Sequence, residues 1–141
     1  MMTRRVLFLL ALPLRLPAGG DTAVRGRLIQ TEAAPGIRTA DGKTILLECD
    51  EATKAVLLDE RLKNDDFEAL GHFDATGKFV INPIYQRALF IYRGGKRLAV
   101  TYWCPICSIR TYSPGICVCC HEETELDPRD PSLKDTDPST G

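Results

Sequence analysis

The feature that most constrains this chain is a cluster of cysteines near its C-terminal end. Five of its six cysteines fall within the seventeen positions from Cys104 to Cys120. They form two Cys-x-x-Cys pairs, Cys104 with Cys107 and Cys117 with Cys120, and Cys119 is an extra thiol inside the second pair. A two-residue spacer lets the backbone wrap so that both sulfurs face one point, and two such loops supply the four thiolates of a tetrahedral zinc site.

The segment between the two pairs contains a turn that suits such a site. Pro114-Gly115 stands just before the second pair and can aim its loop back at the first. Thiolates are soft ligands that select zinc, copper(I) or iron over magnesium or calcium. Because four protein thiolates leave no coordination position for water, we expect a structural or interaction role. We predict a metal-binding knuckle over residues 104–126, with zinc bound by Cys104, Cys107, Cys117 and Cys120.

The same residues resemble a known metal-binding module. The pattern is Tyr102-x-Cys-Pro-x-Cys107, then Pro114-Gly115-x-Cys-x-x-Cys120, then Leu126. It is similar to the short heavy-metal-binding module found beside bacterial copper and zinc efflux proteins, and to zinc ribbons in general. The resemblance covers about 25 residues and implies metal binding through the four paired cysteines. The module usually has histidine where this chain has Cys107, and Gly-Met where this chain has His121-Glu122, which favours a four-thiolate zinc site over copper handling.

Three other interpretations of the cysteines stay open at the level of sequence. Cysteines of exported proteins often form disulfides, and six of them allow many pairings. Cys117 to His121 matches the Cys-x-x-Cys-His attachment motif of c-type haem, with His121 as axial ligand and His72 as the remaining histidine. Haem, or iron in the four-thiolate site, would make the protein an electron carrier. A Cys-x-x-Cys pair can also be a thiol–disulfide redox catalyst, but no helix pattern follows Cys107. Cys49 stands apart and is expected to pack as a small hydrophobic residue.

The N-terminal residues have the pattern of a secretory signal peptide. A basic start with Arg4-Arg5 precedes an apolar run from Val6 to Leu14, and Ala18-Gly19-Gly20 offers small residues for a peptidase. Arg4-Arg5 also resembles the start of a twin-arginine export signal. The apolar run is too short to span a bilayer comfortably. We therefore predict a signal peptide over residues 1–20 and a periplasmic or secreted protein that is not integral to the membrane after cleavage.

The net charge and the absence of catalytic motifs argue against two classes of function, nucleic-acid binding and enzymatic activity. The formal net charge of the chain is −1, and removing residues 1–20 takes away three arginines and no acid, which leaves about −4. A mildly acidic protein is not expected to bind nucleic acid, whereas a protein partner stays open. The sequence contains no paired carboxylates in a catalytic setting, no nucleophile elbow and no phosphate-binding glycine loop, so we expect no enzymatic activity. A cytoplasmic nucleic-acid-binding protein is the alternative if the export prediction is wrong.

The middle of the chain has the turn and strand pattern of a small β-barrel. Residues 24–29 alternate between apolar and polar side chains, Asp41-Gly42 is a hairpin dipeptide, and Asp50 can cap a short helix. The order of strand, hairpin, helix and hairpin over residues 22–103 resembles an OB-fold, with a sandwich-like or SH3-like barrel as the competing topology. Residues 127–141 are rich in Pro, Asp and Ser, which predicts a disordered tail. The predicted fold class is mainly β: an OB-like barrel with one short helix and a C-terminal zinc-ribbon-like knuckle.

Overall fold

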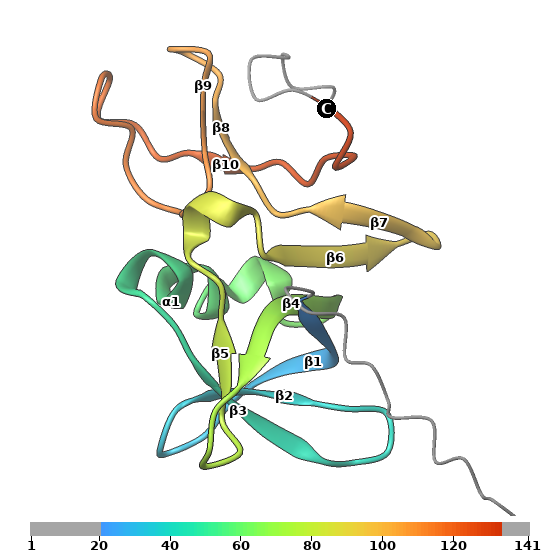
Figure 1. The fold of residues 1–141 in the computed structure, drawn as a ribbon. Coiled ribbons are helices and arrows are strands. Elements are labelled where there is room, and N and C mark those ends of the chain that lie inside the picture. The colour runs from blue at the N-terminus through green and yellow to red at the C-terminus, as the bar shows by residue number, and fades with distance from the viewer. Residues whose placement is uncertain (1–20, 134–141) are drawn as a thin grey trace, which may run out of the picture.

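The computed structural model describes residues 21–133 and is built mainly of β-strands (Figure 1). The predicted signal peptide and residues 134–141 lie outside the described residues. None of the described helices has the length and hydropathy to cross a membrane. In chain order the elements are β1 (Thr22–Gln30), β2 (Pro35–Arg38), β3 (Thr44–Glu48), α1 (Glu51–Leu57), η1 (Glu60–Leu62), β4 (Asp66–Phe73), β5 (Phe79–Ile81), η2 (Ile84–Gln86), β6 (Leu89–Arg93), β7 (Lys96–Ala99), β8 (Tyr102–Cys104), β9 (Ile109–Thr111) and β10 (Glu125–Leu126).

Five strands close into a barrel in the order β1-β2-β3-β5-β4, and β1 also pairs with β4 to complete the ring. The β3–β5 pair is parallel, and the other pairs of the barrel are antiparallel. The helix α1 connects β3 to β4, which is the position that an OB-fold gives its helix. The prediction of a mainly β, OB-like barrel with one short helix is therefore confirmed.

Closure of the barrel depends on Gly26, where β1 changes partner. The residues up to Gly26 pair with β4, and those from Arg27 onward pair with β2. The chains approach so closely here that a Cβ atom on Gly26 would lie 2.2 Å from the carbonyl oxygen of Arg38. Since every residue other than glycine carries that Cβ atom, only glycine fits this bend.

The residues predicted to form the Asp41-Gly42 turn and the helix cap at Asp50 do so in the structure. Gly42 has a φ of 84° in the β2–β3 hairpin, a conformation that glycine adopts at little cost. Asp50 caps α1, because its Oδ1 accepts a hydrogen bond of 2.7 Å from the N–H of Thr53. In the β4–β5 turn, Asp74 Oδ1 accepts a hydrogen bond of 2.8 Å from the N–H of Thr76. The turns help to set the register of the paired strands, and the register determines which side chains face the interior of the barrel.

Alternate residues of the strands fill the interior of the barrel, where α1 covers one end. The largest fully buried side chains are Tyr102, Phe67, Phe79, Ile37, Leu57, Leu62, Ile91 and Val56. Tyr102 comes from β8 and still belongs to the core cluster that the barrel strands form. The C-terminal part of the chain is therefore packed onto the barrel and shares its core.

The strands after β5 build a second part of the molecule. β6 pairs with β4 and β7 with β6, so this hairpin extends the barrel sheet. Further along, β8 is the central strand of a separate sheet in the order β10-β8-β9, at the opposite end of the molecule from the β2–β3 hairpin (Figure 1). β7 ends at Ala99 and β8 begins at Tyr102, and between them the backbone carbonyl of Thr101 accepts a hydrogen bond of 2.8 Å from the N–H of Asp127.

The segment from 127 to 133 packs against the folded body, which corrects the prediction of a disordered tail beginning at residue 127. Ala99 and Arg129 form a backbone bridge, with N–H···O distances of 2.6 and 3.0 Å. The Nη1 atom of Arg110 donates to Asp127 Oδ2 at 2.6 Å, and the side chain of Arg110 is only 2% exposed. The polar composition of the segment suggested disorder. Composition alone cannot reveal this buried ion pair, because Arg110 and Asp127 are far apart in the sequence.

We predict that truncation after Leu126 destabilises the protein strongly, because it leaves the buried guanidinium of Arg110 without its carboxylate. Loss of one partner of a buried pair costs roughly 3–5 kcal/mol. Urea unfolding followed by tryptophan fluorescence measures the change in the free energy of unfolding. Truncation after Leu133 is the matched control and should have little effect, since residues 134–141 carry no large apolar side chain. Equal stability of the two truncated proteins would contradict the role assigned to Asp127.

Candidate metal centre

Two loops of the C-terminal sheet bring four cysteines together. The first loop begins at Cys104, the last residue of β8, and contains Cys107. The second contains Cys117 and Cys120 and lies between β9 and β10. The four Sγ atoms all lie within 4.8 Å of one another. Cys104 and Cys117 are buried, and the other two are partly buried. The structure thus brings together the four cysteines that the sequence predicted as ligands.

The two Cys-x-x-Cys loops have the same backbone geometry. The N–H of Ser108 donates to the carbonyl of Cys104 at 2.8 Å, and the N–H of His121 donates to the carbonyl of Cys117 at 2.9 Å. Each loop then leaves through a residue with positive φ, 53° at Ser108 and 61° at His121. In the first loop the N–H of Cys107 also points at Cys104 Sγ, at 3.4 Å. Two equivalent loops therefore present their sulfurs to a common centre.

The spacing of the sulfurs suits a tetrahedral cation. With a metal–sulfur distance of about 2.3 Å, the edges of a four-thiolate tetrahedron are about 3.8 Å. The distance between Cys104 Sγ and Cys120 Sγ is 3.4 Å, which is close to such an edge. It is also well above the S–S distance of about 2.05 Å in a disulfide, and all six cysteines are free thiols. The cluster therefore has the size and the donor atoms for a soft divalent ion.

The surroundings of the thiols differ from one another. Backbone N–H groups of Cys120 and Cys119 point at Cys117 and lower the pKa of its thiol to about 7. A hydrogen bond with Cys119, together with burial, raises the pKa of Cys107. Since four thiolates held within 4.8 Å repel one another, a full set of anions needs a bound cation. Metal binding at this site must therefore release protons, and a fall in pH must weaken it.

The remaining sulfur and imidazole groups lie outside the cluster of four. Cys119 is exposed, although its thiol reaches Cys107. Cys49 is partly buried against the barrel core, and burial raises the pKa of its thiol to about 11, as expected for a cysteine that packs as a small hydrophobic residue. His72 on β4 and His121 are both exposed.

A charged contact connects the two parts of the molecule beside the cysteine cluster. The Tyr102 hydroxyl, two residues before Cys104, donates to Asp59 Oδ2 at 2.7 Å. Arg61 Nη2 donates to the same Oδ2 at 2.9 Å, and Arg61 Nη1 reaches the carbonyl of Thr124 at 3.5 Å. Asp59 thus joins the segment after α1 to β8, and Arg61 extends the contact to Thr124, the residue before β10. The sequence gave no sign that Asp59 is the partner of Tyr102, because the two residues lie 43 positions apart.

The loops of the metal centre expose most of their apolar side chains. Ile106 and Ile116 are each 66% exposed, and Val118 is 89% exposed. These side chains add little to a core, so apolar packing does not hold the two loops together. Trp103 is buried beneath the guanidinium of Arg110, which lies 4.7 Å from the ring centroid. The C-terminal sheet is thus well packed at Trp103, whereas the cysteine loops that it carries are weakly packed.

Comparison of the chain with protein-family models, with curated proteins and with solved structures finds no match. The function proposed below therefore rests on the geometry of the site.

We predict that Asp59→Asn lowers the free energy of unfolding at neutral pH by roughly 1–2 kcal/mol, because the charged acceptor is lost while its shape is kept. Burial opposes ionisation of Asp59, but hydrogen bonds from Arg61 and Tyr102 outweigh it and lower the pKa of the carboxyl. A lowered folded-state pKa stabilises the fold above the unfolded value of about 3.9, and this stabilisation is lost as the pH falls through the folded-state pKa.

The difference between the wild type and Asp59→Asn should therefore be largest at neutral pH and disappear in acid. Urea unfolding at a series of pH values measures it. Glu60→Gln is the matched control, since Glu60 is an exposed neighbour that forms no ion pair with a residue of the range 21–133. A difference that does not change with pH would show that the charge of Asp59 has no part in the contact.

Proposed function

We propose that this protein is a small, exported, non-enzymatic metal-binding protein that holds one zinc ion in the cluster of four cysteines. The observation that carries the proposal is the convergence of four Sγ atoms, within 4.8 Å, from two loops of equivalent geometry. An all-sulfur donor set is typical of zinc, and four protein ligands close its coordination sphere. The zinc ion would then stabilise structure rather than activate water.

The arrangement is similar to a zinc ribbon. A three-stranded sheet, β10-β8-β9, carries two Cys-x-x-Cys loops, and each loop ends in a left-handed residue, Ser108 or His121. Because the apolar side chains of these loops face solvent, metal binding would supply the free energy that a core supplies elsewhere. Ile106, Ile116 and Val118 are exposed and form an apolar surface over the loops, which a protein partner would cover.

The geometry is less favourable to the alternative chemistries. Attachment of c-type haem needs Cys117 and Cys120 to face the haem edge with His121 as axial ligand, whereas both sulfurs lie in the cluster and His121 is exposed. A thiol–disulfide catalyst places its reactive cysteine at a helix N-terminus, whereas a turn follows Cys104. Iron in the same four-thiolate site remains the chemical alternative to zinc.

We predict one zinc ion per chain in the purified protein, and its loss when any of the four ligands is replaced by serine. Elemental analysis measures the stoichiometry, and amide hydrogen exchange measures the order of each segment. In Cys104→Ser or Cys117→Ser, residues 104–126 should lose amide protection, since binding free energy is folding free energy at such a site. The barrel strands β1 to β5 should keep their protection.

Cys119→Ser and Cys49→Ser are the matched controls and should keep a full equivalent of zinc, since both lie outside the cluster. His121→Gly should also keep it, because glycine suits the positive φ at this position. A visible absorption band in the Soret region that disappears in His121→Gly would establish haem instead. Loss of zinc in Cys119→Ser but not in Cys120→Ser would contradict the ligand assignment.

The proposal of export makes a separate prediction. The mature protein, isolated from the periplasm or medium of a producing cell, should begin between residues 19 and 24, after the small residues Ala18-Gly19-Gly20. N-terminal sequencing measures this directly. A soluble cytoplasmic product with an intact Met1 would refute export and leave the zinc proposal untouched.

A further inference from the structure

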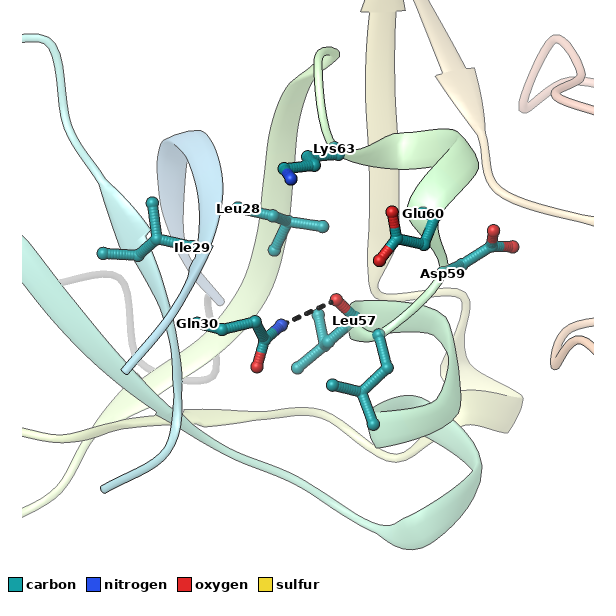
Figure 2. Close-up of a pocket in the computed structure, with 8 residues that line it drawn as sticks. Leu28, Ile29, Gln30, Leu57, Asp59, Glu60 and Lys63 are labelled. Atoms are coloured by element: carbon teal, nitrogen blue, oxygen red, sulfur yellow. Dashed lines mark hydrogen bonds between the residues drawn. The ribbon is translucent and has the colours of Figure 1, made fainter. Parts of the chain in front are cut away.

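A second candidate site lies on the barrel, where β1 separates from β4. A pocket of about 400 Å³ opens between the second half of β1 and the segment that joins α1 to η1. Leu28 and Ile29 lie on one side of it and Leu57 on the other (Figure 2), and Leu58 completes the apolar lining. The carboxylates of Asp59 and Glu60 also line this pocket. Leu58 is 52% exposed, so its apolar side chain is accessible to a molecule bound in the pocket. This pocket is called the β1 groove below.

The β1 groove is bordered by an open strand edge. The hairpin closes with the N–H of Thr31 donating to the carbonyl of Ala34, so the hydrogen-bonded pairs that follow are Ile29 with Gly36 and Arg27 with Arg38. The N–H and C=O groups of Leu28 and Gln30 therefore point away from β2. Pairing with β4 ends at Gly26, and no hydrogen bond joins these backbone groups to another residue within 21–133. Two residues of β1 thus offer a free edge to the groove.

One side-chain contact crosses the groove at its end. Gln30 Nε2 donates to the carbonyl of Leu57 at 3.2 Å, shown as the dashed line in Figure 2. Gln30 is exposed, so this contact can exchange with water at little cost. The groove can therefore admit a chain along β1 without a change in the barrel.

Beyond Leu28 the groove continues into a second hollow of about 520 Å³ that carries unpaired positive charge. Arg27, Arg38 and Lys63 line it, all three are exposed, and none forms an ion pair with a described residue. Two arginines outside this hollow have carboxylate partners: Arg25 on β1 pairs with Asp66, and Arg93 on β6 pairs with Asp65. Asp66, the carboxylate that lines this hollow, is already paired with Arg25, and within residues 21–133 the Arg27 side chain donates only to the backbone carbonyl of Asn64, at 2.7 Å. The hollow therefore keeps a local excess of positive charge on a protein whose net charge is negative.

We propose that the β1 groove binds an extended segment of a partner protein that carries both apolar and acidic side chains, by adding it as a strand to the edge of β1. The backbone of the segment pairs with Leu28 and Gln30, an apolar side chain enters the pocket beside Leu57 and Leu58, and acidic side chains lie over Arg27, Arg38 and Lys63. Strand addition takes its affinity from main-chain hydrogen bonds and its specificity from pockets for alternate side chains.

A peptide suits this groove better than a single-stranded nucleic acid. Among residues 21–133, no aromatic side chain lines either hollow, so these residues give bases no surface on which to stack. The open N–H and C=O groups of β1 match another backbone, and the leucine and isoleucine wall matches an apolar side chain. The charge of the second hollow then selects acidic over basic segments.

The test uses the full-length mature protein with its metal and a fluorescent nonapeptide of alternating leucine and aspartate as the probe. Fluorescence anisotropy should show saturable binding in the micromolar range typical of weak strand addition. Amide chemical shifts and exchange rates of Leu28 and Gln30 should change on binding, because their N–H groups become paired. The same peptide N-methylated at alternate amides should bind at least tenfold more weakly, since its side chains are unchanged and its edge is blocked.

Variants of exposed residues locate the site without threatening the fold. The charge reversals Arg38→Glu and Lys63→Glu should each weaken binding about tenfold and should improve binding of an alternating leucine–lysine peptide. Leu58→Ser should weaken both peptides. Lys43→Glu is the control, since Lys43 is exposed and lies outside both hollows, and it should change affinity less than twofold.

Several results would overturn the proposal. Equal binding of the N-methylated peptide would exclude strand addition, and unchanged amide signals at Leu28 and Gln30 would place the peptide elsewhere. If the leucine–aspartate peptide does not bind at concentrations up to millimolar, an extended apolar and acidic segment is excluded as the ligand of the β1 groove. Binding of a 15-residue oligothymidylate that is lost in Arg38→Glu, with no peptide binding, would identify the groove as a nucleic-acid site instead.

Discussion

The double pairing of β1 is the constraint on which the rest of the structure depends. One strand must serve β4 with its first half and β2 with its second, and Gly26 permits this because no side chain stands between it and the carbonyl of Arg38. Closure removes the free edges that an open sheet would present. The same change of partner leaves the backbone of Leu28 and Gln30 unpaired within the described chain. The change of partner therefore closes the barrel and also leaves one short strand edge unpaired.

The two parts of the molecule are stabilised by different means. The barrel has a core of buried strand residues to which Tyr102 contributes, whereas the cysteine loops turn Ile106, Ile116 and Val118 toward solvent. A ligand that binds four thiolates can replace the missing core of such a segment. Between the two parts stands Asp59, which accepts hydrogen bonds from Tyr102 and Arg61. The Asp59 carboxylate and the burial of Tyr102 in the barrel core connect the cluster to the barrel, whereas the buried pair of Arg110 with Asp127 joins segments within the C-terminal part.

Local signals of the sequence predicted a large part of this architecture. Asp50 as a cap and Asp41-Gly42 as a turn act within a few residues, so their effects can be recognised without knowledge of the fold. The two Cys-x-x-Cys pairs are local in the same sense. The sequence could not show that Asp59 meets Tyr102 or that Arg110 meets Asp127, because each pairing depends on the three-dimensional packing of separate elements. For that reason the segment after Leu126 was expected to be disordered although it packs against the body.

The placement of the four cysteines also has a consequence for folding, because it sets how much chain must close before the thiols meet. Cys104 and Cys120 are sixteen residues apart, whereas the barrel closes only when Thr22 reaches Gly71. A short loop closes at a smaller entropic cost and more often than a long one, so the thiols can meet before the barrel strands have found their registers. A metal ion captured at that stage would turn the flexible C-terminal end into a compact unit with a fixed sheet. The barrel would then complete its core around Tyr102, a side chain that the captured metal has already brought near its final position.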